Sequence, residues 1–275
     1  MQDFSGPGDP LSQDTFDACV QTIGAANEAL WAVLSVETSG CGYQRDRRPK
    51  ILFERHIFHR LTQGRFDAED PDVSAPTSGG YGTGGAYQYV RLAAAMQLDE
   101  EAALQSASWG LGQILGTNFK AAGYPDVGTM VQAFVRSEDE QLTGMVRFIK
   151  TQGMATSLAG KSWTEFARRY NGPSYAKNRY NELLELFCGN YESRGCPDIA
   201  LRTAQIFLTF LGVAIGGVDG LIGPRTRMAL RDYETAQHLP VTEAADAATL
   251  DALRRSVLAT VREVSAPTEE ENDGR

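Results

Sequence analysis

The sequence lacks two features that would narrow its function at once, a long apolar run and a set of metal-binding residues. A membrane-spanning helix needs about 20 apolar residues, and no stretch of the chain approaches that length. The 275 residues include only 3 histidines and 4 cysteines. The cysteines, Cys19, Cys41, Cys188 and Cys196, match no zinc-binding spacing. We therefore expect no membrane insertion, no metal and no organic cofactor.

Basic residues are in deficit, with 26 Lys and Arg against 35 Asp and Glu and a net charge of −9. Proteins that bind nucleic acid usually carry a clustered basic surface, so nucleic acid is not expected as a partner. The first ten residues contain neither the basic segment nor the apolar segment of a secretory signal. We expect synthesis in the cytoplasm without a signal peptide, followed by release or delivery to any external target.

The even number of cysteines leaves two alternatives open. The count permits two disulfides between cysteines close in sequence, Cys19–Cys41 and Cys188–Cys196. Reduced, buried thiols are the usual state in a cytoplasmic protein.

Apolar residues recur at helical spacing along most of the chain, which predicts a mainly α-helical protein. A first helix is expected over 14–36, and Asp99 is expected to cap another that runs to about Ser106. Leu142 and Ile149 mark one face of a further helix.

Other signals predict helix starts and the interruptions between helices. Ser162 and Glu165 form a capping-box pattern, and Pro173 is expected to open the next helix. The segment 48–56 reads as extended at its start, because Pro49 disfavours a helical conformation in its predecessor. The Gly- and Pro-rich segment 70–89 is expected to be a mobile loop beside a site.

Breaks in these patterns predict two domains. A flexible arm is expected over 1–13, a first domain over 14–190 and a smaller one over 198–262. The junction falls within 188–197, which is rich in turn-forming residues. The acidic segment 263–275 has nothing to bury and is expected to be disordered.

Three short motifs stand out against this background. Glu37 lies in Ser-Val-Glu-Thr-Ser-Gly, where a long apolar helix ends, followed by Gly-Leu-Gly-Gln-Ile at 110–114 and Tyr-Asn-Gly-Pro at 170–173. Their order resembles that in goose-type lysozymes and soluble lytic transglycosylases. More closely, 15–187 resembles the N-acetylmuramidase domain of modular phage endolysins and bacteriolytic effectors, with 48–56 and 106–113 also carrying the likeness.

Residues 201–255 resemble the three-helix peptidoglycan-binding domain of cell-wall hydrolases. One departure is Tyr233-Glu234, where members of that family commonly have Phe-Gln. The residues that carry the likeness are Ala204, Gln205, Leu211, Gly212, Asp219, Gly220, Ile222, Gly223, Thr226 and Ala229.

These resemblances imply a mainly α protein with a lysozyme-like catalytic domain, a small extended region and a helical wall-binding domain. Glu37 matches the acid that protonates the glycosidic oxygen of peptidoglycan. Its apolar neighbours Trp31, Val33, Leu34 and Val36 are expected to keep it protonated near neutral pH.

A second carboxylate would hold the attacking water, and Glu54 is the best candidate because it follows an apolar extended run. The alternative is that Glu54 only pairs with Arg55, Arg60 or another basic group. Goose-type enzymes and transglycosylases also work with one essential Glu, so the reaction does not require a partner. Three acidic residues near the Gly-rich loop are fallbacks: Asp67, Asp70 and Asp72.

Four polar residues of the motifs are expected to bind substrate. Ser108 and Gln113 match positions that touch the saccharide or its peptide stem in the resembled families, although Gln113 could instead satisfy backbone groups. Tyr170 and Asn171 are expected to position the sugar and to hydrogen-bond Glu37. The alternative is that Asn171 and Gly172 only terminate a helix.

The resulting interpretation is a monomeric muramidase that cleaves the β-1,4 bond between N-acetylmuramic acid and N-acetylglucosamine and lyses bacteria. Peptidoglycan is its expected partner. Release through a holin-made lesion and delivery by a secretion system, with a cognate immunity protein, both fit the absent signal, and either places the activity in the periplasm. The alternatives are a lytic transglycosylase that leaves 1,6-anhydromuramyl products and a non-catalytic wall-binding protein.

Overall fold

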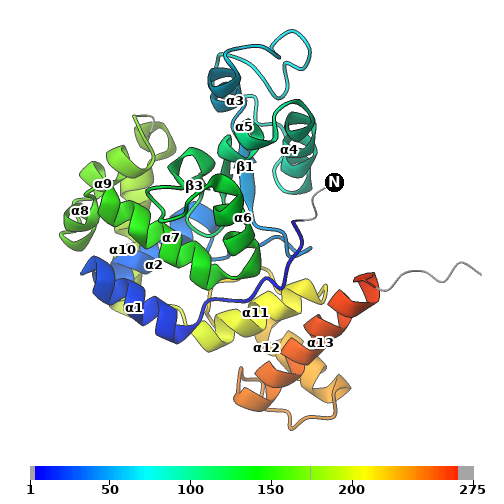
Figure 1. Cartoon of the computed structure of the whole chain (residues 1–275). Coiled ribbons are helices and arrows are strands. Elements are labelled where there is room, and N and C mark those ends of the chain that lie inside the picture. The colour runs from blue at the N-terminus through cyan, green and yellow to red at the C-terminus, as the bar shows by residue number, and fades with distance from the viewer. Residues whose placement is uncertain (1–3, 174, 266–275) are drawn as a thin grey trace, which may run out of the picture.

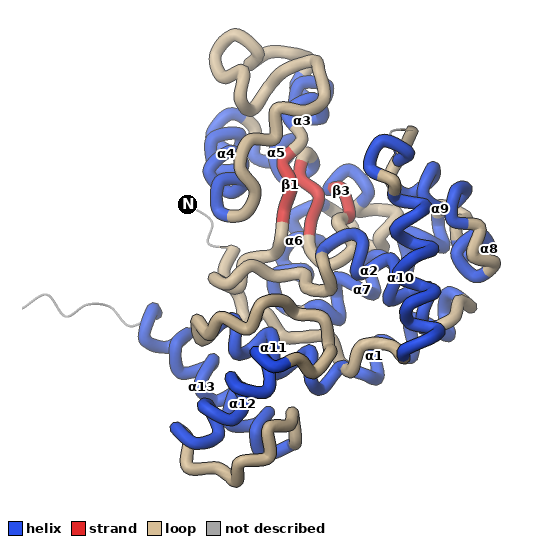
Figure 2. Tube along the Cα trace, turned by 180° about the vertical axis from the view of Figure 1, so that it is seen from behind, coloured by secondary structure: helices blue, strands red, loops and turns tan. Residues whose placement is uncertain are grey.

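The computed structural model describes residues 4–173 and 175–265, with side chains described as far as residue 260. Helices dominate, and they surround one small antiparallel sheet of three strands in the order β1-β2-β3 (Figures 1 and 2). The strands are β1 (Ile51–Phe53), β2 (Ala107–Trp109) and β3 (Ile114–Leu115). This confirms the predicted fold class, a mainly α protein with a small extended region and a helical C-terminal domain.

The helices fall into two groups along the chain. The first group precedes residue 195 and is listed here with its two 3₁₀ turns: α1 (Gln13–Ile23), α2 (Asn27–Thr38), α3 (Arg55–Thr62), α4 (Ala86–Leu98), α5 (Glu100–Gln105), η1 (Gly116–Asn118), α6 (Val127–Arg136), α7 (Glu138–Thr151), α8 (Ala155–Ala159), α9 (Trp163–Tyr170), η2 (Tyr175–Asn178) and α10 (Tyr180–Arg194). The second group is α11 (Ile199–Phe210), α12 (Pro224–Ala236) and α13 (Ala247–Ser265).

The single helix expected over 14–36 is wrong, because the segment forms two helices. Gly24 ends α1 in the left-handed conformation (φ 69°), which L-residues with side chains adopt less readily. The short connection lets α2 turn into the core, where Ala29 to Leu34 are all buried. α2 therefore runs through the interior of the first group and carries Glu37 in its last turn.

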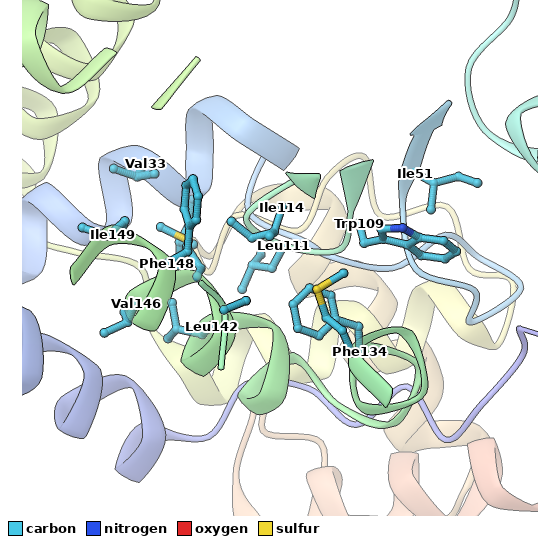
Figure 3. Packing of buried hydrophobic residues seen from close by; sticks show 14 of the residues in the cluster. Val33, Ile51, Trp109, Leu111, Ile114, Phe134, Leu142, Val146, Phe148 and Ile149 are labelled. Carbon is cyan, nitrogen blue, oxygen red and sulfur yellow. The ribbon is translucent and has the colours of Figure 1, made fainter. Parts of the chain in front are cut away.

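The core of the first group surrounds α2 and α7. Leu142, Val146 and Ile149 of α7 are buried, as the predicted helix face requires. Figure 3 shows these side chains in the same cluster as Val33 of α2, while Trp109 of β2 lies at the other end of the cluster. Because one core cluster contains residues of α2, α7 and β2, packing fixes α2 relative to the sheet.

Helix starts agree with the sequence only in part. The Asp99 side chain accepts a hydrogen bond from the Ala102 N–H and caps α5 as predicted. Ser162 does precede α9, but its side chain makes no capping hydrogen bond, so the predicted capping box is absent. The continuous helix expected from Pro173 is also wrong, because Arg179 adopts a left-handed conformation (φ 54°) and separates η2 from α10.

The N-terminal arm and the predicted domain junction are more ordered than the sequence suggests. Over its described part the N-terminal arm is packed, with Phe4 and Leu11 buried and Asp9 bridged to Ser137. The junction expected within 188–197 is mostly helix, since α10 continues to Arg194. Each of these segments is too short to show a helical repeat of apolar residues, so the sequence did not predict this order. Residues 266–275 of the predicted acidic tail lie outside the described residues.

The three helices predicted near the C-terminus are present and enclose a second core. This core also contains Cys41 and Tyr43, which belong in sequence to the first group. All four cysteines are free thiols, as expected for reduced, buried residues; Cys196 alone is half-buried. Within the described part of the chain, no helix is long and apolar enough to cross a membrane.

Candidate active site

A cleft of about 930 Å³ opens between the sheet and the C-terminal ends of α2 and α9. Its walls come from segments far apart in sequence, so only the fold brings them together. The cleft is lined by the two preferred catalytic candidates and the four expected substrate-binding residues: Glu37, Glu54, Ser108, Gln113, Tyr170 and Asn171.

Glu37 lies on the helical wall of the cleft. Burial raises the pKa of its carboxyl from 4.5 to about 7, and a hydrogen bond from Asn171 opposes that rise. The Asn171 Nδ2 donates to Glu37 Oε1 at 2.8 Å. Because an amide carries no charge, it orients the carboxyl without forcing it to ionise. At neutral pH Glu37 is therefore held in position with a large protonated fraction.

The end of α9 explains how Tyr170 and Asn171 reach this wall. Asn171 is the C-cap of α9, and Gly172 follows it with φ 76°. The helix-terminating and Glu37-binding interpretations of Asn171 are thus both correct. Tyr170 differs from expectation, because its hydroxyl donates to the Gly112 carbonyl at 2.6 Å rather than to Glu37. It ties α9 to the β2–β3 turn.

Glu54 lies on the opposite wall, between β1 and α3. Its N–H donates to the Ser106 carbonyl at 2.8 Å, which anchors it beside β2. Burial raises the pKa of its carboxyl, and the nearby His56, Tyr81 and Arg91 oppose that rise. Glu54 Oε2 lies 3.3 Å from His56 Nδ1. Among the described residues this oxygen is buried and has no hydrogen-bond partner.

The alternative to a catalytic role, pairing of Glu54 with a basic group, is met in part: among the described residues neither Arg55 nor Arg60 is its ion-pair partner, but His56 is. The Arg55 guanidinium instead donates to the Pro71 carbonyl. Both Glu54 and its partner His56 line the cleft.

Tyr81 was not predicted from the sequence, yet its hydroxyl is one of the groups that oppose the rise in the pKa of Glu54. It belongs to the Gly-rich segment that precedes α4. The Gln88 side-chain amide donates to the carbonyls of Tyr81 and Thr83 at 2.6 and 2.9 Å, and Arg91 donates to the Tyr81 carbonyl at 3.3 Å. α4 thus holds the loop and brings its tyrosine over Glu54.

Ser108 and Gln113 line the floor of the cleft from β2 and the β2–β3 turn. Gln113 Nε2 donates to the carbonyls of Gly110 and Lys50 at 2.9 and 3.2 Å, which supports its backbone-satisfying interpretation. Its positive φ of 47° shows that the turn holds it in a left-handed conformation. Lys50 in turn donates from Nζ to the Thr38 carbonyl at 2.8 Å, linking this floor to the end of α2.

The fallback carboxylates lie away from the cleft. Asp67 accepts from Ser74 Oγ at 2.6 Å and pairs with His59, while Asp72 accepts from the Tyr87 hydroxyl at 3.0 Å. Neither they nor Asp70 line the cleft. In the described residues, no cluster of three or more His, Cys, Asp or Glu side chains could hold a metal ion.

Tyr180 is a second residue that the sequence motifs missed. It lines the cleft at the start of α10, and burial with the nearby charge of Glu37 raises its pKa to about 12. A lone tyrosine in a helical pattern gives no signal of such a position, since it reads as an ordinary half-buried residue.

The departure from the wall-binding pattern at Tyr233-Glu234 has a local explanation. Glu234 is fully buried, and its carboxylate accepts hydrogen bonds from the backbone N–H groups of Thr242 and Glu243 and from the Thr249 hydroxyl. The carboxylate fixes the loop between α12 and α13. The substitution therefore affects the interior of the domain, not an exposed surface.

Comparison with known proteins agrees with this geometry. Residues 26–192 match the family model of N-acetylmuramidase, and residues 199–253 match that of a peptidoglycan binding domain. The crystal structure of a Burkholderia AP3 phage endolysin is similar, with 39% sequence identity and a TM-score of 0.61 over 66% of this chain and 71% of that chain. Among proteins with curated functions, none matches. The chain belongs to the N-acetylmuramidase family of lysozyme-type glycoside hydrolases and carries a peptidoglycan-binding domain at its C-terminal end.

Proposed function

We propose that Glu37 is the general acid of this muramidase and that Glu54 is the general base that activates water. The observation that carries the proposal is the contrast between the two carboxyl groups of one cleft. Glu37 is buried beside a neutral amide, so its pKa is raised to about 7. Burial also raises the pKa of Glu54, but the charges of His56 and Arg91 oppose that rise, whereas Glu37 has only the neutral amide of Asn171 to oppose it. Two carboxyls whose surroundings differ in this way suit acid and base roles.

In this mechanism the Glu37 carboxyl protonates the oxygen of the β-1,4 bond as positive charge develops on the sugar. Glu54 accepts a proton from a water that attacks the anomeric carbon from the other face. Ser108, Gln113, Tyr170 and Asn171 bind and orient the glycan strand from the floor and the helical wall.

Digestion of purified sacculi by the wild type and Glu37→Gln tests the acid. Loss of a general acid typically lowers a rate by 10²–10⁴-fold, and the amide of Gln keeps the shape of the site. A variant that retains more than about a tenth of the wild-type rate would show that the acid is misassigned.

The products test the rest of the mechanism. Mass spectrometry separates hydrolysis from transglycosylation, because the 1,6-anhydro product is lighter by one water. Direct attack by water inverts the anomeric centre, so NMR of the initial product should show the α-anomer. An initial β-anomer would mean that Glu54 is a nucleophile, and an anhydro product would mean that no water is activated.

The setting of the reaction is also part of the proposal. We infer that a monomer acts on periplasmic peptidoglycan after holin-dependent release or after delivery by a secretion system. The similarity to a phage endolysin supports the first route. Co-expression with a candidate immunity protein that suppresses lysis would favour the second.

A further inference from the structure

We infer that Arg202, in the peptidoglycan-binding domain, is a positioning residue for the active site. Arg202 acts by holding the segment that follows Glu37. The binding domain is therefore packed against the active-site region and is not attached by a flexible linker alone. The inference rests on the proposed role of Glu37 as acid. It begins with one ion pair that joins the two groups of helices.

Arg202 of α11 and Glu138 of α7 form this ion pair, and both side chains are fully buried. The two guanidinium nitrogens Nη1 and Nη2 donate to the two carboxylate oxygens at 2.6 and 2.7 Å. Such a bidentate pair fixes orientation as well as distance. A buried arginine that pairs with the neighbouring domain is not expected in a wall-binding domain attached only by a flexible linker.

Both members of the pair also bind the segment directly after α2. Arg202 Nε donates to the Gly40 carbonyl at 2.6 Å, and Glu138 Oε1 accepts from the Gly42 N–H at 2.8 Å. Glu138 Oε2 accepts in addition from the Leu11 N–H at 3.0 Å. The pair therefore organises residues 40–42, which begin three residues after Glu37.

This segment has little freedom to relax if the pair is broken. Gly40 has φ 81°, and a Cβ atom there would lie 2.8 Å from the Val218 carbonyl oxygen of the binding domain. Cys41 belongs to the core of the binding domain, as does Tyr43, whose hydroxyl donates to the Phe134 carbonyl at 2.9 Å. The chain that leaves the active-site helix thus passes through the interface.

The contacts around Glu37 make its position sensitive to this segment. The groups that face it from neighbouring elements are Asn171 and Tyr170 at the end of α9 and Tyr180 of α10, none of them charged near neutral pH. Its acidity depends on exclusion of water. A loosened residue 40–42 segment would admit water and move the carboxyl relative to Asn171.

The test compares two substitutions at Arg202 with a control in the full-length chain. Arg202→Met removes the pair, and Arg202→Lys keeps the charge but loses the fork that reaches Glu138 and Gly40 together. Arg254→Met is the control, because Arg254 also joins the binding domain to the first group, through Asp9 at 3.7 Å, but is exposed. Binding to sacculi is measured by co-sedimentation. Turnover is measured on solubilised glycan strands, which the enzyme can cleave without being anchored to a wall.

We expect both Arg202 variants to bind sacculi as the wild type does. Turnover of soluble strands should fall about 10- to 100-fold for Arg202→Met, as for a catalytic group displaced by about 1 Å, and by less for Arg202→Lys. Arg254→Met should match the wild type. If Arg202→Met does not fold, Arg202→Lys decides the question. Folded Arg202→Lys with wild-type turnover, or equal losses in Arg202→Lys and Arg254→Met, would overturn the inference.

A second measurement separates this inference from the proposed mechanism. ¹³C NMR titration follows the Glu37 carboxyl, assigned by its absence in Glu37→Gln, and does not require activity. We expect its pKa to move toward the ordinary value in Arg202→Lys and to stay unchanged in Arg254→Met. An inactive wild type, or a fully active Glu37→Gln, would disprove the catalytic proposal, while an unchanged titration in Arg202→Lys would disprove the coupling.

Discussion

Glu37 and Glu54 face one cleft, yet helices hold the first and a strand end with a Gly-rich loop holds the second. Glu37 is half-buried on the helical wall of the cleft and has a neutral amide as its hydrogen-bond partner. Glu54 has a histidine, an arginine and a tyrosine around it, each of which favours its charged form. Burial raises the pKa of both carboxyls, but only that of Glu54 is opposed by charged neighbours, a difference that suits the proposed acid and base roles. Four changes would break or sharpen this contrast.

Glu37→Gln should be more stable than the wild type in alkaline solution. The pKa of the Glu37 carboxyl is raised from 4.5 in the unfolded chain to about 7 in the folded protein. The free energy of unfolding therefore falls as pH rises from about 4.5, and the loss is complete once pH has passed about 7. The two proteins should unfold alike near pH 4 and differ by about 3 kcal/mol at pH 8, with Gln favoured. Urea denaturation at both pH values measures the difference.

The control for this prediction is Glu185→Gln, which changes an exposed glutamate of α10. It should leave the pH dependence of stability as in the wild type. If Glu37→Gln gains no stability at pH 8, the pKa of Glu37 is not raised by its surroundings.

Glu54→Gln should lower turnover of solubilised glycan strands about 100-fold, because a general base contributes at least that much. Asp67→Asn is the matched control, since this fallback carboxylate lies outside the cleft, and it should retain the wild-type rate. Steady-state kinetics with both variants measures the effect. Equal rates for Glu54→Gln and the wild type would mean that Glu37 works with water alone.

Asn171→Ala should lower the rate about tenfold, since Glu37 loses the group that orients it. The lost hydrogen bond is one that lowers the pKa of Glu37, so the pKa should rise further above 7. Because the acid must be protonated, the alkaline limb of the pH–rate profile should move to higher pH. A shift to lower pH would show that water enters the cleft and outweighs the lost bond.

Tyr81→Phe should have the smallest effect, a loss of about fivefold in rate, as for one hydrogen bond of about 1 kcal/mol. The Tyr81 hydroxyl lowers the pKa of Glu54, so its removal should raise that pKa and move the acidic limb of the profile to higher pH. Tyr87→Phe is the control, because the Tyr87 hydroxyl binds Asp72 outside the cleft. A Tyr81→Phe profile that coincides with that of Tyr87→Phe would remove Tyr81 from the site.

The contrast between the two walls also explains what the sequence could predict. Glu37, Gln113 and Asn171 stand in short motifs whose local geometry, a helix end or a tight turn, is visible in the residues themselves. Glu54 follows an apolar strand and was predicted for that reason. All four line the cleft.

Tyr81, Tyr180 and Arg202 could not be predicted in the same way. Their roles arise from contacts with residues far away in sequence. A single tyrosine normally indicates a half-buried residue and a single arginine a solvated one. The packed arm around Phe4 and Leu11 was missed for the same reason. Gly24 could have indicated a helix end, but apolar residues continue at helical spacing on both sides of it. That spacing predicted a single helix.

The buried pair between Glu138 and Arg202 has a consequence for how the enzyme works on an insoluble polymer. A module on a flexible tether lets its enzyme sweep a volume around each attachment point. A module fixed by a buried bidentate pair instead sets one distance and one direction between the attachment point and the bond that is cut. Such an enzyme would have to detach and rebind before each new cut beyond that reach, so its rate on intact walls would follow the lifetime of attachment.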